Sequence, residues 1–293
     1  MSDKILINGI ALVLQGGGTR GAFTAGVLDV LMEHGIQFNY VIGTSAGALN
    51  AVNYISGDIG RSRKVSTELM LDRKFVGKWN MIAHRGIFNF DYLFHVVPKT
   101  KLPFNAQAYE SSNVTFVVAA TRMEDGFPVY FNRKDFDDFY PAIAASASLP
   151  LVSRPVKVGN GYYLDGGVGA AIPFRKPFAD GYQKAVIVET RALGYEKPNP
   201  SKKKLRLAKF LYRRFPGFLD GYRIEGDIYN KDEELILRLQ ADGKAFVIRP
   251  DVPPQVTRTE KDQKKLNALY ETGRQVMERH LEDLLVFCGV RHE

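Results

Sequence analysis

The sequence up to Ser56 repeats one pattern twice: an apolar run, a turn of small residues and a segment with helical spacing. The apolar runs are Ile10 to Leu14 and Tyr40 to Ile42, and the helical segments are Gly21 to Met32 and Ala46 to Ile55. Strands that alternate with helices in this way form a parallel sheet with helices on both faces. This pattern therefore predicts an α/β fold.

Five later apolar runs predict further strands of the same sheet, at Val114 to Ala120, Pro128 to Phe131, Tyr162 to Leu164, Ala185 to Glu189 and Ala245 to Arg249. The long segment Gly57 to Asn113 between them is rich in aromatic residues but lacks a clean period. We expect short helices there. Two interpretations of its aromatic side chains stay open: they form a cover over a site, or they fill the core.

The C-terminal part predicts one long amphipathic helix. Thr259 and Asp262 have the spacing of an N-terminal capping arrangement. Apolar residues then repeat at helical spacing through Leu266, Leu269, Tyr270, Val276, Met277, Leu281 and Leu284. We expect this helix to close the fold.

Length and composition bound the organisation of the chain. With 293 residues and 45% hydrophobic content, we expect a single domain over 1–293, with the motifs at about 10–190 and a C-terminal extension at about 192–293. Cys288 is the one cysteine, so no intramolecular disulfide forms and the cytoplasm is the expected location. Residues 1–10 lack a basic, then apolar, leader pattern, and no apolar run approaches about 18 residues. We therefore expect neither secretion nor a membrane span.

Ser45 is the candidate nucleophile. It stands in Gly43-Thr44-Ser45-Ala46-Gly47, directly after a predicted strand and before a predicted helix. A serine that projects from a tight strand-to-helix turn needs strained backbone angles and small neighbours, which Gly43 and Gly47 supply. The amides at the start of the following helix favour negative charge near the serine oxygen.

The glycine-rich turn Gly16-Gly17-Gly18-Thr19-Arg20-Gly21 fits an anion site better than a nucleotide site. A dinucleotide site needs an acidic residue about 20 positions later, and none is present there; a Walker loop needs a Gly-Lys-Ser/Thr sequence, which is also missing. Open backbone amides at a helix start can hold an oxyanion. We assign this role to Gly17 and Gly18, and expect Arg20 to brace the loop or to contact an anionic head group.

A serine needs a base to remove its proton, and the five histidines are poor candidates. His34, His84 and His95 precede the carboxylate candidates, His280 falls on the apolar stripe of the closing helix, and His292 is next to the last residue. Asp165 follows a predicted strand and precedes Gly166 and Gly167, where parallel sheets place functional groups. We therefore predict a Ser45/Asp165 dyad, and a plain Asp-Gly turn is the alternative.

Three motifs now stand in order: Gly16 to Gly21, Gly43 to Gly47, and Asp165-Gly166-Gly167. This order, with a serine and an aspartate but no histidine, resembles the patatin-like phospholipase family. Ala145 to Pro150 also looks like the small Ser/Ala-rich segment, ending in proline, that the family carries between its serine and its aspartate. The resemblance spans roughly Ile10 to Pro173.

The resemblance implies a three-layer α/β/α fold with a mainly parallel central sheet. It further implies hydrolysis of carboxylic ester bonds in phospholipids or lysophospholipids through an acyl-enzyme, without metal or organic cofactor. Ser45 would be the nucleophile, Asp165 the general base, and Gly17 and Gly18 the oxyanion amides. The supporting motif positions are Gly16, Thr19, Arg20, Gly21, Gly43, Gly47, Gly166 and Gly167. One departure concerns Asp165: family members often place asparagine before the proline that follows, whereas Ala171 and Ile172 precede Pro173 here.

Two other functions stay open. An esterase or thioesterase acting on soluble acyl compounds would use the same residues. A non-catalytic lipid-binding or nucleotide-binding protein could keep the loop geometry alone, although the presence of both Ser45 and Asp165 argues against it. Head group, acyl length and oligomeric state do not follow from the sequence.

The net charge of +8 is concentrated in the basic tract from Lys202 to Arg214, which holds seven basic and no acidic residues. On a helical wheel Leu205, Ala208, Leu211, Tyr212 and Phe215 gather on one side, and Pro216 ends the pattern. Such a helix either lies on an anionic membrane, as a peripheral contact at its inner face, or packs on the domain with a solvated basic face. Other basic residues are dispersed, so we expect no nucleic-acid binding.

Overall fold

The computed structural model describes residues 4–83 and 86–290. Its sheet of eight strands has the order β5-β6-β3-β2-β1-β7-β8, with β4 paired to β3 outside this path. The strands are β1 (Ile5–Leu14), β2 (Ile36–Thr44), β3 (Thr115–Arg122), β4 (Pro128–Asn132), β5 (Val156–Val158), β6 (Gly161–Asp165), β7 (Lys184–Val188) and β8 (Ala245–Ile248). Each expected strand is present, β1 begins five residues early at Ile5, and the sequence did not predict the short β5.

Neighbouring strands among β1, β2, β3, β7 and β8 run parallel, whereas β4 and β6 run antiparallel to β3 and β5 antiparallel to β6. The prediction of an α/β fold with a mainly parallel central sheet is therefore confirmed. β8 comes from the C-terminal region and extends this sheet beside β7. That pairing supports the prediction of one domain, which stays a prediction.

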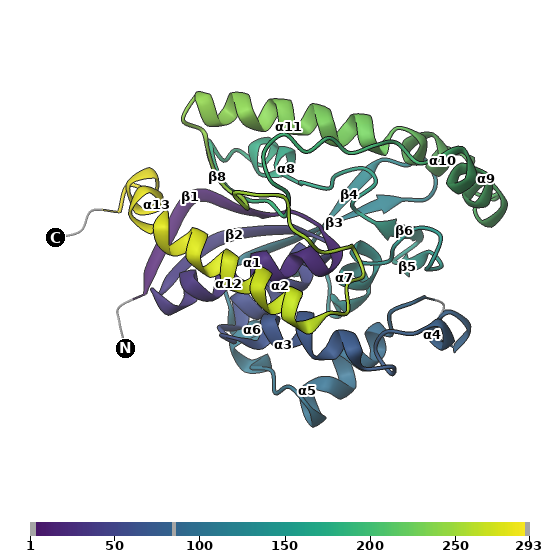
Figure 1. Ribbon diagram of the computed structural model, residues 1–293, viewed down its shortest axis with the longest axis horizontal. Helices are drawn as coiled ribbons and strands as arrows, with labels where there is room; N and C mark the ends of the chain where they lie inside the picture. The colour runs from purple at the N-terminus through teal and green to yellow at the C-terminus, as the bar shows by residue number, and fades with distance from the viewer. Residues whose placement is uncertain (1–3, 84–85, 291–293) are drawn as a thin grey trace.

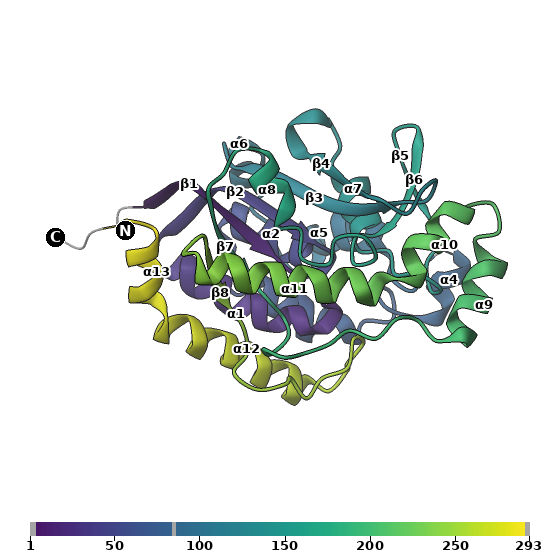
Figure 2. The ribbon, with the colours of Figure 1, turned by 90° about the horizontal axis from the view of Figure 1, so that it is seen from above.

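Helices cover both faces of the sheet and give three layers (Figure 1). One face carries α1 (Gly21–Glu33), α2 (Ala46–Ser56), α7 (Tyr140–Ser146) and α12 (Gln263–Arg279); the other carries α8 (Arg175–Ala179) and α11 (Glu225–Ala241). Figure 2 shows α11 lying across the second face. Side chains alternate along β1, so that Leu12 and Leu14 join one core and Ala11 and Val13 the other. Burial on both sides explains why the strands are apolar runs.

The segment that follows α2 consists of short helices, as predicted. They are α3 (Arg61–Thr67), the 3-10 helix η2 (Leu69–Leu71), α4 (Lys78–Ala83), the π-helix η3 (Tyr92–Val96), α5 (Val97–Thr100) and α6 (Ala106–Ser111). They enclose an apolar cluster of their own, which contains Met70, Phe75 and Tyr92 and is packed against Phe88 and Phe90. The aromatic side chains therefore fill a satellite core, and some of them also line a pocket described below.

The C-terminal region departs from the predictions in two places. The closing helix is divided at His280 into α12 and α13 (Leu281–Phe287). The N-cap of α12 is Asp262, whose carboxylate accepts hydrogen bonds from the amides of Lys264 and Lys265, so the expected pairing of Thr259 with Asp262 is wrong. Asp262 caps the helix directly because the backbone first turns helical at Gln263.

The basic tract forms α9 (Lys202–Leu211), which already ends at its C-cap Tyr212, so the expectation that Pro216 ends this helix is wrong. Pro216 instead opens α10 (Pro216–Arg223) as its first residue. Ala208 and Tyr212 are buried on Met123 and Phe218, with Leu205 and Phe215 packed beside them. This confirms that one side of α9 packs on the fold. Leu211, which the helical wheel assigns to that side, is instead exposed.

The remaining helical turns are η1 (Gly18–Arg20) and η4 (Arg133–Asp135). Among the described helices, none is both long and apolar enough to span a membrane.

Candidate active site

Ser45 occupies the sharp turn between β2 and α2. Its backbone has φ of 54° and ψ of −119°, a conformation that costs a non-glycine residue about 1 to 3 kcal/mol. The turn requires small neighbours: a Cβ on Gly47 would lie 2.3 Å from the carbonyl oxygen of Leu14, and one on Gly43 would lie 2.6 Å from the amide of Ala48. The strained serine between two obligatory glycines is the geometry expected of a nucleophile elbow.

Strand pairing brings Asp165 next to Ser45. β2 pairs with β3 as far as Thr44, which lies opposite Ala119, and the next β3 residue, Ala120, pairs with Asp165, the last residue of β6. Since β4 occupies the other edge of β3 at these positions, β6 continues along the edge that β2 leaves free. The hydroxyl of Ser45 donates a hydrogen bond of 2.7 Å to Asp165 Oδ2 across 120 residues of sequence.

Asp165 lies at the end of a strand, but this strand, β6, does not run parallel to its neighbour β3. Asp165 ends an antiparallel strand that runs back toward the carboxyl edge of the parallel strands. The sequence of β6 gives no sign of its direction, because alternation and apolar content are alike in both orientations.

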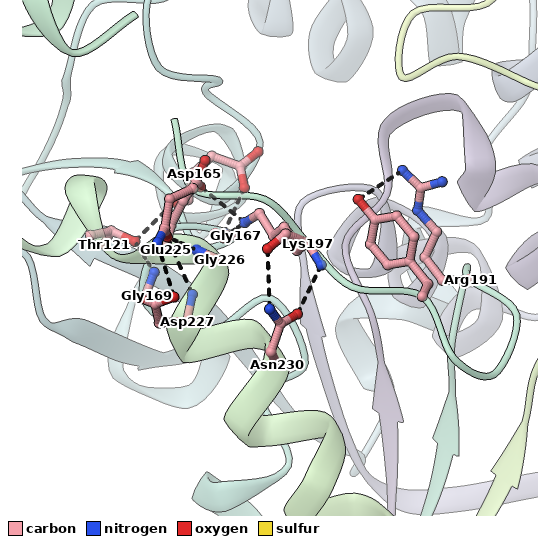
Figure 3. Close-up of polar contacts among 12 residues, drawn as sticks. Thr121, Asp165, Gly167, Gly169, Arg191, Lys197, Glu225, Gly226, Asp227 and Asn230 are labelled. Carbon is pink, nitrogen blue, oxygen red and sulfur yellow. Dashed lines mark hydrogen bonds and ion pairs between the residues drawn. The ribbon is translucent and has the colours of Figure 1, made fainter. Parts of the chain in front are cut away.

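The carboxyl of Asp165 is nearly fully buried and held from several sides. The Asp165 Oδ1 accepts a hydrogen bond of 2.7 Å from the amide of Gly167 (Figure 3). The Thr121 hydroxyl donates to the backbone carbonyl oxygen of Asp165. Burial raises its pKa above the ordinary value, and the hydrogen bonds from Ser45 and Gly167 act in the opposite direction. A carboxylate in this state is a stronger base than one in water.

Ala171 and Ile172 replace the family asparagine without leaving Asp165 unsupported. The carbonyl of Ala171 accepts a hydrogen bond from the amide of Gly16, and the Thr44 hydroxyl donates to the carbonyl of Ala170. These bonds join the segment after Asp165 to the loops after β1 and β2. The carboxyl of Asp165 itself accepts hydrogen bonds from the Ser45 hydroxyl and the Gly167 amide.

Ser146 contacts the backbone of Ser45 at its strained turn, and the sequence did not predict this contact. Its Oγ accepts a hydrogen bond of 2.8 Å from the amide of Ser45 and donates one of 2.6 Å to the carbonyl of Ala119. Ser146 is fully buried at the end of α7. The small-residue segment Ala145 to Pro150 was the signal that could have found it.

The glycine-rich loop lines the same pocket as Ser45, and two of its backbone amides have no hydrogen-bond acceptor within the described residues. Within the described residues, the N–H groups of Gly17 and Gly18 donate no hydrogen bond, and both residues line the same pocket as Ser45. Gly18 has φ of +59°, and a Cβ there would lie 2.3 Å from the carbonyl oxygen of Arg258. That carbonyl accepts from the amide of Thr19 at 3.1 Å, and the Thr19 hydroxyl donates to Thr257. The loop is thus braced by the segment between β8 and α12.

Two other predicted motif positions, Gly21 and Gly166, form hydrogen bonds through their backbone atoms that join neighbouring elements of the site. The carbonyl of Gly21, the first residue of α1, accepts a hydrogen bond from Asn50 of α2. Gly166 donates through its amide to the carbonyl of Ser146. Arg20, at the end of the loop, is buried.

Two pockets of different character share Ser45, Gly18 and Leu149 in their linings. The polar pocket adds Gln15, Gly16, Gly17, Arg20, Asp165, Gly167, Ala171, Thr190, Arg191, Tyr195, Lys197, Tyr229 and Arg258. The apolar pocket adds Thr19, Ala46, Leu49, Asn50, Asn53, Val65, Ser66, Met70, Phe75, Phe88, Phe90 and Ala147. The serine hydroxyl therefore lies where a polar and an apolar binding region meet.

Several lining residues come from the C-terminal region, where the sequence analysis named no site residue. Lys197 Nζ lies 2.9 Å from Glu225 Oε2 and donates to the carbonyl of Gly167 at 3.0 Å, next to the Asp165 turn (Figure 3). Arg191 and Arg258 line the same pocket. No local motif marks Arg191, Lys197 and Arg258, because they reach this pocket only through contacts between segments that lie far apart in the sequence.

Among the described residues, no histidine lines either pocket. His34, His95 and His280 lie elsewhere, and His84 and His292 fall outside the described residues. His280 is half exposed at the end of α12, with its ring against Phe246. It is a helix-end residue at the rim of the core rather than a member of the apolar stripe.

A family model described as patatin-like phospholipase matches residues 12–177. The chain belongs to the patatin-like phospholipase family. A second model, a domain of unknown function (DUF6363), matches residues 215–289. The family match thus covers the glycine-rich loop, Ser45 and Asp165, whereas Arg191, Lys197 and Arg258 lie beyond it.

The chain is also similar to individual proteins. YjjU, an uncharacterized protein of Escherichia coli, is 33% identical over 187 residues, which are 62% of this chain and 52% of YjjU. A probable lipid hydrolase, 463L of Invertebrate iridescent virus 6, is 25% identical over 179 residues, which are 55% of this chain and 61% of that protein. The chain thus spans between half and two thirds of these relatives. The solved structure of VipD from Legionella pneumophila covers 94% of this chain and 67% of its own, with a TM-score of 0.48 and 12% identity.

Proposed function

We propose that this protein is a serine acyl hydrolase that cleaves carboxylic ester bonds of phospholipids or lysophospholipids through the Ser45/Asp165 dyad. One observation carries the proposal: the hydrogen bond of 2.7 Å between Ser45 Oγ and Asp165 Oδ2 lies where the polar and the apolar pocket meet. An ester with its acyl chain in one pocket and its alcohol part in the other would present its carbonyl carbon to Ser45.

The proposed cycle has two displacements at the acyl carbon. Ser45 Oγ attacks the ester carbonyl while Asp165 takes its proton, and the carbonyl oxygen becomes an oxyanion. The tetrahedral intermediate then expels the alcohol oxygen, which receives the proton from Asp165, and leaves the acyl group on Ser45. Water, deprotonated by Asp165, attacks this ester, and Ser45 leaves with the proton while the fatty acid departs.

The amides of Gly17 and Gly18 are the proposed donors to the oxyanion. Both are free within the described residues and line the pocket that contains Ser45. In a well-studied hydrolase, loss of one such donor costs about 3 kcal/mol of transition-state stabilisation. The bracing of this loop by Arg258 and Thr257 keeps the amides in a fixed position before substrate arrives.

The apolar pocket favours a lipid over a short soluble acyl compound. Met70, Phe75, Phe88 and Phe90 line it, and Phe75 and Phe88 contact each other with ring centroids 5.6 Å apart. Such a wall removes the apolar surface of a long acyl chain from water, worth about 0.8 kcal/mol for each buried methylene. The name of the viral relative, a probable lipid hydrolase, points in the same direction.

Fatty-acid release from a panel of lipid esters tests the proposal. Wild type should release fatty acid, and Ser45→Ala should release none while its melting temperature stays near that of wild type. Asp165→Asn keeps an oxygen for the Gly167 amide and should fold but react far more slowly. Equal turnover by Ser45→Ala and wild type would reject the mechanism. Chain-length independence from acetyl to palmitoyl esters would favour the soluble esterase instead.

We further propose that α9 brings the enzyme to an anionic membrane surface. Its packed side is occupied by the fold, but Leu207, Phe210 and Leu211 are exposed among the lysines and arginines of the tract. An exposed phenylalanine beside basic residues suits the interface of an anionic bilayer, where each basic residue adds about 1 kcal/mol.

The same end of the molecule carries a second exposed apolar group on α4, with Trp79 and Ile82 (Figures 1 and 2). The loop that contains Ser153 contacts the chain just after α4 and just after α9. Gly86 forms a bridge with Ser153, and the Tyr212 hydroxyl, just after α9, donates to the Ser153 carbonyl. Both apolar groups thus flank one loop whose start, Leu149, lines both pockets.

Vesicle co-sedimentation at increasing anionic lipid content tests the membrane contact. Bound protein should increase with lipid charge, and replacement of Lys203, Arg206 and Lys209 by glutamine should abolish that increase. The matched control replaces three exposed basic residues outside α9: Lys231, Arg238 and Lys244. Equal binding by both triple variants would reject the contact. The cytoplasmic location expected from the sequence stays a prediction.

A further inference from the structure

The polar pocket contains a buried cation, the guanidinium of Arg20, that forms no ion pair with the part of the chain that the structure describes. Arg20 is only 5% exposed, and within residues 4–83 and 86–290 its guanidinium forms no ion pair and its Nε has no hydrogen-bond partner. Arginines are seldom buried unless they are paired. An isolated charge in the interior costs several kcal/mol, which a bound anion would offset.

Other positive groups line the same pocket and add to this charge. Arg191 lies with its guanidinium carbon 4.0 Å from the centroid of the Tyr195 ring, an arrangement that fixes its position (Figure 3). Arg258 is exposed at the loop that braces Gly18. Burial, followed by the charges of Arg191 and Arg258, lowers the pKa of Arg20 to about 10. Arg20 is therefore still charged at neutral pH, and the three guanidiniums repel one another.

The nearby carboxylates already have other partners. Glu225 pairs with Lys197 at 2.9 Å, and Asp165 accepts from Ser45 and Gly167. Glu233, which accepts a hydrogen bond from the pocket residue Tyr229, lies 3.7 Å from Arg249. Arg20, Arg191 and Arg258 have no ion pair within the described residues. A phosphate monoester, which carries a charge of about −1.5 to −2 at pH 7, would therefore offset part of the positive charge of these three arginines.

We propose that the polar pocket binds the phosphate of the substrate's head group, so that the enzyme selects acyl esters of glycerol phosphate with a net negative head. This rests on the proposed function, since it assigns the alcohol part of the ester to this pocket. Arginine suits this task because its planar guanidinium binds phosphate oxygens in pairs. Ser45 lines the same pocket, so the phosphate must lie within a few bonds of the ester, as it does in acyl glycerol phosphates. A choline head would bring its ammonium group to three arginines.

The proposed selectivity comes from outside the part that matches the patatin-like phospholipase model. Arg20 lies within residues 12–177, whereas Arg191 follows them and Arg258 belongs to the 215–289 match. The C-terminal region would thus add the head-group specificity to a site whose chemical groups come from the N-terminal region.

Hydrolysis of three palmitoyl esters tests the selectivity: lysophosphatidate, lysophosphatidylcholine and monopalmitoylglycerol, each in the same neutral detergent micelles. We expect kcat/KM for lysophosphatidate to exceed the other two values at least about 10-fold, the equivalent of one charge-assisted contact. Arg191→Gln and Arg258→Gln should each reduce this ratio, and Arg238→Gln on the exposed side of α11 is the matched control. Equal kcat/KM for all three esters, or equal loss on all three in the arginine variants, would overturn the proposal.

Binding of sn-glycerol 3-phosphate to the Ser45→Ala variant, measured by calorimetry, separates this proposal from the proposed function. Binding that weakens about 10-fold on adding Arg191→Gln supports the phosphate site even if wild type hydrolyses no ester, an outcome that would reject the function alone. Ester hydrolysis by wild type together with no binding of glycerol 3-phosphate would keep the function and reject the phosphate site. Arg191 and Arg258 are partly or fully exposed, so their variants should fold.

Discussion

Ser146→Ala should weaken both the fold and the activity, because the Ser146 hydroxyl joins two buried backbone groups. It accepts from the amide of Ser45 at 2.8 Å and donates to the carbonyl of Ala119 at 2.6 Å. The substitution removes both bonds and leaves the two backbone groups without these partners at a buried position. Alanine fits the space, so no steric effect competes with the loss.

The magnitude follows from these two groups. A buried polar group that loses its partner costs about 1 to 3 kcal/mol, so the free energy of unfolding should fall by about 2 to 4 kcal/mol. Ser45 is also held in a strained conformation, with φ of 54°, and would relax without this contact. A shift of about 1 Å in the nucleophile costs about 100-fold in rate, so kcat should fall by that order.

Urea unfolding and ester hydrolysis measure the two effects, with Ser148→Ala as the matched control. Ser148 lies two residues away and is equally buried, but its hydroxyl donates only to the carbonyl of Ala144, one turn earlier in the chain. The control should lose less than about 1 kcal/mol and keep kcat within a few-fold of wild type. If both variants behave alike, or if Ser146→Ala keeps full kcat, Ser45 is held by β2 and α2 alone and the reasoning is refuted.

Three further predictions concern charge, space and the membrane. Burial raises the pKa of Asp165, so this carboxyl destabilises the fold as pH rises above its unfolded pKa; Asp165→Asn should therefore melt higher than wild type at pH 8, with a gap that closes toward pH 4. In wild type, kcat/KM should fall as pH drops through the raised pKa, and a pH profile flat from 4 to 8 would contradict both statements. Gly47→Ala would place a Cβ 2.3 Å from the Leu14 carbonyl oxygen and should cost about 3 kcal/mol in urea unfolding; an unchanged midpoint would show that the turn can relax. Phe210→Ser on α9 should weaken binding to anionic vesicles. The control Leu237→Ser, which changes an exposed apolar residue of α11, should not, and equal binding by the two variants would show that α9 does not contact the membrane.

Local patterns predicted the strands and the two catalytic candidates because each depends on a short stretch of chain. Glycines at Gly43 and Gly47 are required by the turn itself, so the sequence around Ser45 reports its geometry. The same holds for the apolar runs of the parallel strands, which are buried on both faces. The missed β5 has only three residues, too few for a period.

Features that depend on contacts between distant segments could not be predicted. The direction of β6 follows from the space that β2 leaves beside β3, and the bracing of Gly18 by Arg258 joins positions 240 residues apart. The role of Ser146 needs the same kind of information, since serine in a small-residue run is common. The predicted ends of the closing helix were wrong for a related reason. The backbone conformation at Asp262 and at His280 determines where α12 begins and ends, whereas the apolar stripe continues past His280 into α13.

Labelling with a fluorophosphonate probe, followed by mass spectrometry of the digested protein, tests the central claim most directly. The probe bonds only to an activated serine, so the account predicts a single adduct on the peptide that contains Ser45, in a chain with many other serines. The adduct should be lost in Ser45→Ala and form much more slowly in Asp165→Asn. An adduct on another serine, or equal labelling of wild type and Asp165→Asn, would contradict the dyad.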